Sequence, residues 1–119
     1  MSASVLTNLI KQGLNTKNVY PYAIDSGNVT LTDPVFLVTE ILSDLTNYGG
    51  DQYSSVNEQL QVQIYYSEDT TIDVYALENN FLQLLQKNGY RAFDISGHEF
   101  TPDNQTLVIT YKFNHKKEI

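Results

Sequence analysis

The chain offers few side chains that could do chemistry. Its two histidines, His98 and His115, have no second histidine at helical spacing, so we expect no zinc site. Glu40 could act as a general base, but no histidine or second acid lies near it in the sequence. The absence of cysteine excludes disulfides and thiolate metal ligands. The sequence therefore predicts no catalytic residue, no metal ligand, no cofactor and no enzyme activity.

Tyrosine is abundant instead, with nine copies in the chain. Its ring buries a large area while its hydroxyl stays polar, which is why tyrosine is enriched at protein interfaces. Tyr48 and Tyr53 flank Gly49 and Gly50 within residues 43–57, a polar segment between two strand-like stretches. Hairpin loops usually take two to five residues, and longer structureless connections are usually functional. We predict that 43–57 is a long mobile loop that contacts a partner.

A second candidate contact surface lies on the strand expected over residues 58–66. Apolar and polar residues alternate there, so one face is buried and the other carries three glutamines. The glutamines are either ordinary solvent-facing residues or part of a protein interface, since amides pair without the desolvation penalty of charges. Together the candidate interface residues are Tyr48, Gly49, Gly50, Tyr53, Gln59, Gln61, Gln63 and Tyr65.

Hydrophobic periodicity predicts the helices and strands that position these residues. A helix is expected from Ser2 or Ser4 to Gln12, ended by Gly13 in a left-handed turn, and a longer one over 71–88 with a broad apolar stripe. Strands are expected over 35–42, 58–66, 90–95 and 106–114, with a short extended piece at 18–22. The sequence predicts a single α+β domain over 1–119: a roughly four-stranded antiparallel or mixed sheet with helices packed on one face.

Composition narrows the possible partners. Seven basic and fourteen acidic residues give a net charge of −7, which argues against a grip on nucleic acid. Residues 115–119 follow the last expected strand and are interpreted as a solvated tail. The chain shows neither a signal peptide nor a membrane span, so we expect no membrane partner and a cytoplasmic protein.

Several segments in order resemble a known family. They are Val19-Tyr20-Pro21-Tyr22, Phe36-Leu37-Val38-Thr39-Glu40, Asn47-Tyr48-Gly49-Gly50-Asp51, Glu58-Gln59-Leu60-Gln61-Val62-Gln63-Ile64-Tyr65-Tyr66 and Asn88-Gly89-Tyr90. The resemblance covers residues 5–114. It points to a family of small tail proteins of tailed, siphovirus-type phages and prophages of Gram-positive bacteria. The α-β-β-α-β-β layout is also similar to that of tail-terminator proteins, which form sixfold rings on the tail tube.

The resemblance implies a structural assembly protein without catalytic residues. Such a tail terminator or tail-completion subunit would form a ring, cap the tail tube and join it to the head connector, while DNA only passes through. It would assemble in the bacterial host cytoplasm and remain in the virion tail. The alternatives are a neck head–tail connector, a small cytoplasmic ligand-binding or regulatory module, and a hydrolase that uses Glu40 or Asp94.

Overall fold

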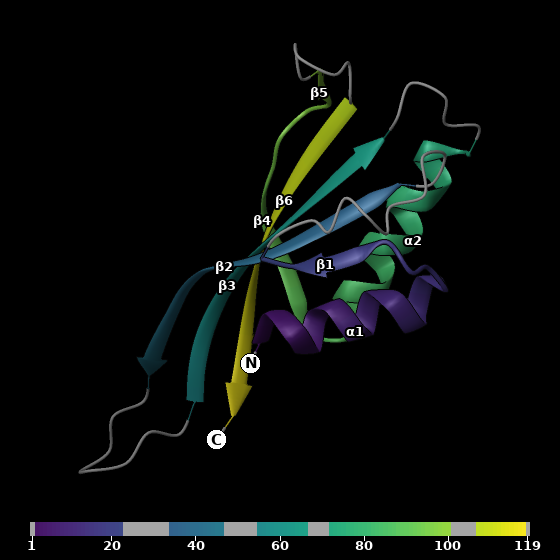
Figure 1. Cartoon of the computed structure of the whole chain (residues 1–119). Helices are drawn as coiled ribbons and strands as arrows, with labels where there is room; N and C mark the ends of the chain where they lie inside the picture. The colour runs from purple at the N-terminus through teal and green to yellow at the C-terminus, as the bar shows by residue number, and fades with distance from the viewer. Residues whose placement is uncertain (1, 23–33, 47–54, 67–71, 101–106, 119) are drawn as a thin grey trace.

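Two helices and a mixed β-sheet make up the protein, which confirms the predicted α+β class (Figure 1). The computed structural model describes residues 2–22, 34–46, 55–66, 72–100 and 107–118. The elements in chain order are α1 (Ser2–Leu14), β1 (Val19–Pro21), β2 (Val35–Thr46), β3 (Ser55–Tyr66), α2 (Val74–Lys87), β4 (Tyr90–Ile95), β5 (Glu99–Phe100) and β6 (Leu107–Glu118).

The sheet is mixed and mostly antiparallel, as predicted. Its main path runs β1-β2-β3-β6-β4, and β5 pairs with β6 beside β4. Only the β1–β2 pairing is parallel among the described strands. The sheet exceeds the expected four strands because the short segments β1 and β5 also pair with it.

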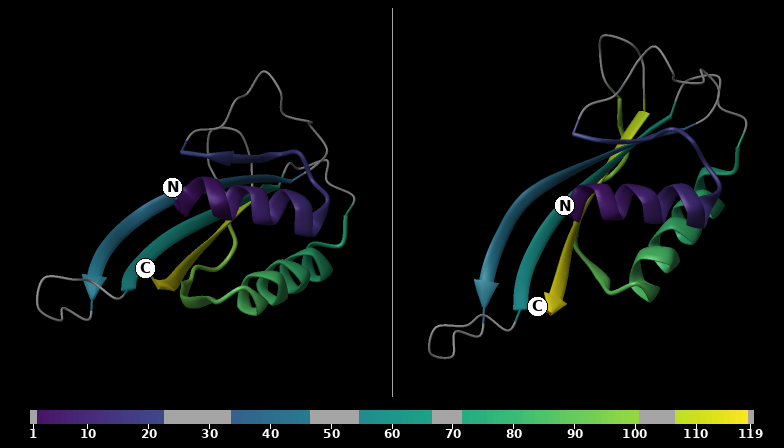
Figure 2. Two further views of the ribbon diagram at one scale, coloured as in Figure 1. Left: turned by 90° about the horizontal axis from the view of Figure 1, so that it is seen from below. Right: turned by 60° about the horizontal axis from the view of Figure 1, so that its bottom comes forward.

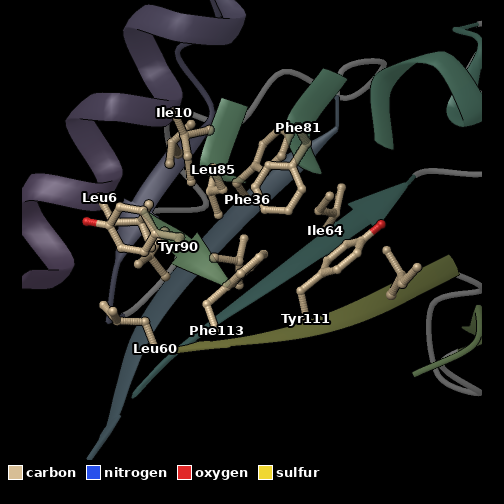
Figure 3. Close-up of a cluster of buried hydrophobic side chains, with 14 of the residues drawn as sticks. Leu6, Ile10, Phe36, Leu60, Ile64, Phe81, Leu85, Tyr90, Tyr111 and Phe113 are labelled. Carbon is tan, nitrogen blue, oxygen red and sulfur yellow. The ribbon is translucent and has the colours of Figure 1, made fainter. Parts of the chain in front are cut away.

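Both helices cover the same face of the sheet, where the core lies (Figure 3). Side chains alternate along a strand, so the register of β2, β3 and β6 brings Phe36, Ile64 and Ile109 into one buried row. Phe81 of α2 lies over these strands. Its ring centroid is 5.7 Å from that of Phe36, 5.1 Å from that of Tyr111 and 5.8 Å from that of Phe113. We call this helix-covered side of the sheet the covered face.

The helix ends follow from local chemistry. Asp73 caps α2, because its side chain accepts a hydrogen bond from the amide of Ala76 at 3.1 Å. Gly89 follows α2 at a φ of 85°, the left-handed conformation expected after a helix. The predicted end of α1 was wrong, because the left-handed residue is Asn15 rather than Gly13. Gly13 instead lies in the helix, where an added Cβ would come within 2.5 Å of Leu84 on α2.

Three strands are longer than the sequence predicts. β2 runs on to Thr46, β3 begins at Ser55, and β6 continues to Glu118, so these parts of the expected loop 43–57 and tail 115–119 are strand. The strands pair along their lengths and supply backbone partners that local propensity does not reveal. Residues 42–46, 55–57 and 116–118 extend past the helices as a three-stranded arm (Figure 2).

Candidate interaction surface

The side of the sheet opposite the helices presents mixed polar and apolar rows. Strand register aligns three rows across β2, β3 and β6, and they are Val35–Tyr65–Val108, Leu37–Gln63–Thr110 and Thr39–Gln61–Lys112. We call this surface the outer face. Most of its residues are half-buried, whereas Val35 is buried. The outer face therefore combines half-buried amides, hydroxyls and aliphatic groups.

The predicted glutamine face exists. Gln59, Gln61, Gln63 and Tyr65 all lie on the outer face of β3, which the alternation in the sequence indicated. Tyr65 donates a hydrogen bond to Oε1 of Gln63 at 3.0 Å, and Nε2 of Gln63 donates to Oγ1 of Thr110 at 3.4 Å. Burial raises the pKa of the Tyr65 hydroxyl, so this side chain stays a donor.

Gln59 and Gln61 differ from Gln63 in their bonding. Their side-chain amides make no hydrogen bond to any other described residue, although both are half-buried. Each side-chain amide carries two donor hydrogens and one acceptor oxygen. The other predicted contact residues, Tyr48, Gly49, Gly50 and Tyr53, lie outside the described residues.

Glu40 has a structural position on the covered face. Its Oε1 accepts hydrogen bonds from the amide of Ala3 at the start of α1 and from the hydroxyl of Tyr22, both at 3.3 Å. A carboxylate at a helix N-terminus is stabilised by the helix dipole. Tyr22 adopts a φ of 70°, a conformation that is uncommon for a bulky residue. Glu40 therefore joins α1, Tyr22 and β2 at the edge of the sheet.

The two acids considered for hydrolysis lie far apart. Asp94 is on β4, where it pairs with Lys112 at 3.7 Å on the outer face. Glu40 is on β2, with β3 and β6 between the two strands. Three strand spacings put the two acids roughly 14 Å apart. The part of the chain that the structure describes holds no group of three potential metal ligands.

The sequence interpretation missed a polar cluster around Glu78 of α2, in which Tyr66 is buried, Glu78 is half-buried and His98 is exposed. One carboxylate oxygen of Glu78 accepts from the hydroxyl of Tyr66 at 2.8 Å and lies 2.7 Å from Nε2 of His98. Burial, and then the bond to Glu78, raise the pKa of Tyr66; burial and Glu78 also raise the pKa of Tyr111. The partners are 12 and 20 residues apart, so no local motif indicated the cluster.

The other histidine also pairs with a glutamate. Nδ1 of His115 lies 3.4 Å from Oε2 of Glu58, and its ring stacks on Tyr90 with centroids 4.1 Å apart. All three residues lie at the end of the core, where β3, β4 and β6 meet. His115 continues the alternation of Tyr111 and Phe113 by one more step. That spacing was the available signal, but the residue was assigned to the tail.

A groove of about 350 Å³ runs between α2 and the edge strand β4. Its lining combines apolar side chains with one amide and one guanidinium, and the residues are Leu82, Gln86, Tyr90, Arg91, Ala92, Ile95 and Phe113. Because Ala92 and Ile95 belong to β4, the groove opens beside that edge of the sheet. No described helix is long and apolar enough to cross a membrane.

These features define an α+β protein whose mixed sheet has one face covered by helices and one mixed polar and apolar outer face. The chain belongs to the family described as "Protein of unknown function (DUF806)", whose model matches residues 3–119. No curated protein matches the chain.

Proposed function

We propose that this protein is a structural subunit that caps the tail tube of a tailed phage and joins it to the head connector. The observation that carries the proposal is the outer face, where the half-buried amides of Gln59 and Gln61 make no hydrogen bond to other described residues. The resemblance to phage tail proteins and the order of helices and strands support the same assignment. The family description itself names no function.

The assembly mechanism depends on repetition. In a ring each contact occurs once per subunit, so interfaces that are weak between two copies sum over the whole ring. A tail-tube end would present a matching set of subunits and so favour the ring over free monomers. The net charge of −7 per chain repels phosphates, which lets DNA pass the ring without sticking to it.

The proposal is tested with phage or prophage tails that lack this protein. We expect such tails to have uncontrolled length and to carry no heads in negative-stain electron microscopy. Adding the purified protein should restore capped tails. Normal, head-bearing tails without the protein would contradict the proposal.

The position of the protein in the virion separates capping from the rival neck role. A gold label on the restored protein should mark the end of the tail tube even when heads are absent. A label found only on heads that lack tails would assign the protein to the neck. Tight, salt-sensitive binding to duplex DNA would instead indicate a nucleic-acid partner.

The segment 47–54 gives a second test. Replacing it with a two-residue turn should leave the sheet intact, because the segment joins the ends of β2 and β3. We expect the shortened protein to fold, by circular dichroism, but to lose its effect on tail length or head joining. Normal assembly with the shortened protein would exclude this segment as a contact region.

A further inference from the structure

Among the described residues, no strand pairs with two edges of the sheet along part of their length. β1 pairs with β2 only at Phe36, Leu37 and Val38. Beyond Val38, no described strand pairs with the edge of β2 that points away from β3. On the opposite side, β4 pairs with β6 and with no other described strand. An unpaired strand edge presents amide and carbonyl groups that can bind a further strand.

The two open edges lie at the same level of the sheet. Asp94 on β4 is aligned with Lys112, which is aligned with Gln61, which in turn is aligned with Thr39 on β2. Three residues further along β6, the row through His115 connects Tyr90 with Ser43 in the same way. Tyr90–Ile95 and the open part of β2 therefore face outward at matching heights on opposite sides of the molecule.

Exposed apolar side chains gather at both edges. Ile41 on β2 is 45% exposed, while Phe93 and Ile95 on β4 are 46% and 49% exposed. Natural sheets usually protect an open edge with charged residues or proline at such positions. Ile95 also lines the groove between α2 and β4, so apolar contact can continue from the strand edge into the groove.

The charges described at the two edges are balanced or already paired. On β4, Arg91 and Asp94 carry opposite charges, and on β2 the carboxylate of Glu40 accepts hydrogen bonds from Ala3 and Tyr22. A contact between these edges would therefore depend on backbone pairing and on apolar side chains.

We propose that the open edge of β2 in one copy of this chain pairs with the edge of β4 in the next copy. The occupant of both edges is thus a second copy of the same chain. This inference rests on the proposed function, since it names the contact that would hold the ring together. It also accounts for the exposed apolar residues on β2 and β4.

The pairing would be antiparallel and would favour closure. β2 and β4 run in opposite directions within the sheet, because each step β2–β3–β6–β4 is antiparallel. A neighbouring copy that continues the sheet brings its β2 antiparallel to β4. A contact between different surfaces gives a ring if the rotation closes and a filament if copies also shift along the axis. Edges at the same level need no shift along the strands, which favours a ring.

Cysteine pairing tests the contact directly. The chain has no cysteine, so the introduced thiols have no native thiol to compete with them. Thr39 and Asp94 share a row on the outer face, and opposed residues in an antiparallel pair come close enough for a disulfide. We expect a T39C and D94C mixture to form a disulfide dimer on mild oxidation, and the T39C/D94C double variant to form a ladder that ends in a ring-sized species.

Controls separate edge pairing from random oxidation. T39C alone and D94C alone should give no dimer, because the contact joins two different edges. Adding Ile41→Lys to T39C should lower the dimer yield about tenfold, since a charge at this edge opposes pairing. Tyr75→Lys on α2 is the matched control: Tyr75 is 77% exposed and lies on neither edge, so the yield should not change.

The outcomes separate this contact from the proposed function. No mixed dimer at the highest attainable protein concentration, equal dimer yields from the single variants, or no effect of Ile41→Lys would overturn the edge contact. Tail capping that persists in those cases would leave the proposed function standing. Conversely, a full disulfide ladder from a protein that never binds tail tubes would retain the contact and remove the function.

Discussion

The two faces of the sheet differ in burial and polarity, although the same strands form both. On the covered face, Phe36, Phe81 and Tyr111 are almost completely buried and pack ring against ring. On the outer face, Gln61 and Lys112 stand in one row, both half-buried, among mixed polar and apolar neighbours. Burial on the covered face stabilises the fold, whereas we have proposed the outer face as a contact surface. The following substitutions test that division.

The largest expected effect is at the centre of the covered face. Phe81→Ala removes a fully buried ring that touches three other rings, so we expect a loss of about 3–5 kcal/mol in unfolding free energy. Urea titration followed by circular dichroism measures it. A loss below ~1 kcal/mol would mean that the helices are not what stabilises this face.

Such core positions are also the part of the fold that the sequence predicts well. Phe81 sits in a stripe of helical period, and Leu60, Val62 and Ile64 alternate as a strand must. The extension of β6 to Glu118 was not predictable in this way, because its last residues are charged and show no apolar alternation. What places them is pairing with β3, which lies far away in the sequence.

The candidate contact surface was predictable only in part, for a related reason. Alternation alone puts Gln59, Gln61, Gln63 and Tyr65 on one face. The pairs His98–Glu78 and His115–Glu58 join residues 20 and 57 positions apart, so their proximity depends on tertiary packing. Edges that lie at the same level likewise follow only from the complete strand register.

The next largest effect is expected from high pH, which should lower the free energy of unfolding through the buried tyrosines of the covered face. Burial raises the pKa of Tyr66 and Tyr111 above the ordinary value of 10.0; the hydrogen bond to Glu78 adds to this at Tyr66, and the charge of Glu78 adds to it at Tyr111. Above about pH 10 the unfolded chain releases these protons while the folded protein keeps them. Stability should therefore be unaffected by these groups below pH 10 and fall above it, by up to about 1.4 kcal/mol per pH unit for each tyrosine.

Urea titrations from pH 7 to pH 11 measure this dependence. Tyr111→Phe should make the decline above pH 10 shallower by up to about 1.4 kcal/mol per pH unit. Tyr75→Phe is the control, because its ring is 77% exposed and should leave the profile unchanged. Equal slopes in Tyr111→Phe and the parent protein would show that ionisation of this hydroxyl does not limit stability.

A smaller effect is expected where the helix layer joins the sheet. Gly89→Ala places a side chain at a φ of 85°, so we expect a loss of about 1 kcal/mol from backbone strain. Gly97→Ala is the matched control, since Gly97 has no atom within 4 Å of an added Cβ and no positive φ. Thermal or urea unfolding of both variants should separate them, and equal stabilities would contradict the role given to Gly89.

The smallest effect on stability belongs to the outer face, where the effect on assembly should be large. Gln61→Ala removes a half-buried amide that bonds to no other described side chain or backbone group, so unfolding free energy should change by less than about 0.5 kcal/mol. If this face contacts another protein, the same variant should cap fewer tail tubes, because the amide's partner is then left unsatisfied. Gln83→Ala, on the exposed side of α2, should change neither property. Normal capping by the Gln61 variant would assign the outer face to solvent, whereas unfolding as severe as that of Phe81→Ala would mean that the two faces are not separate.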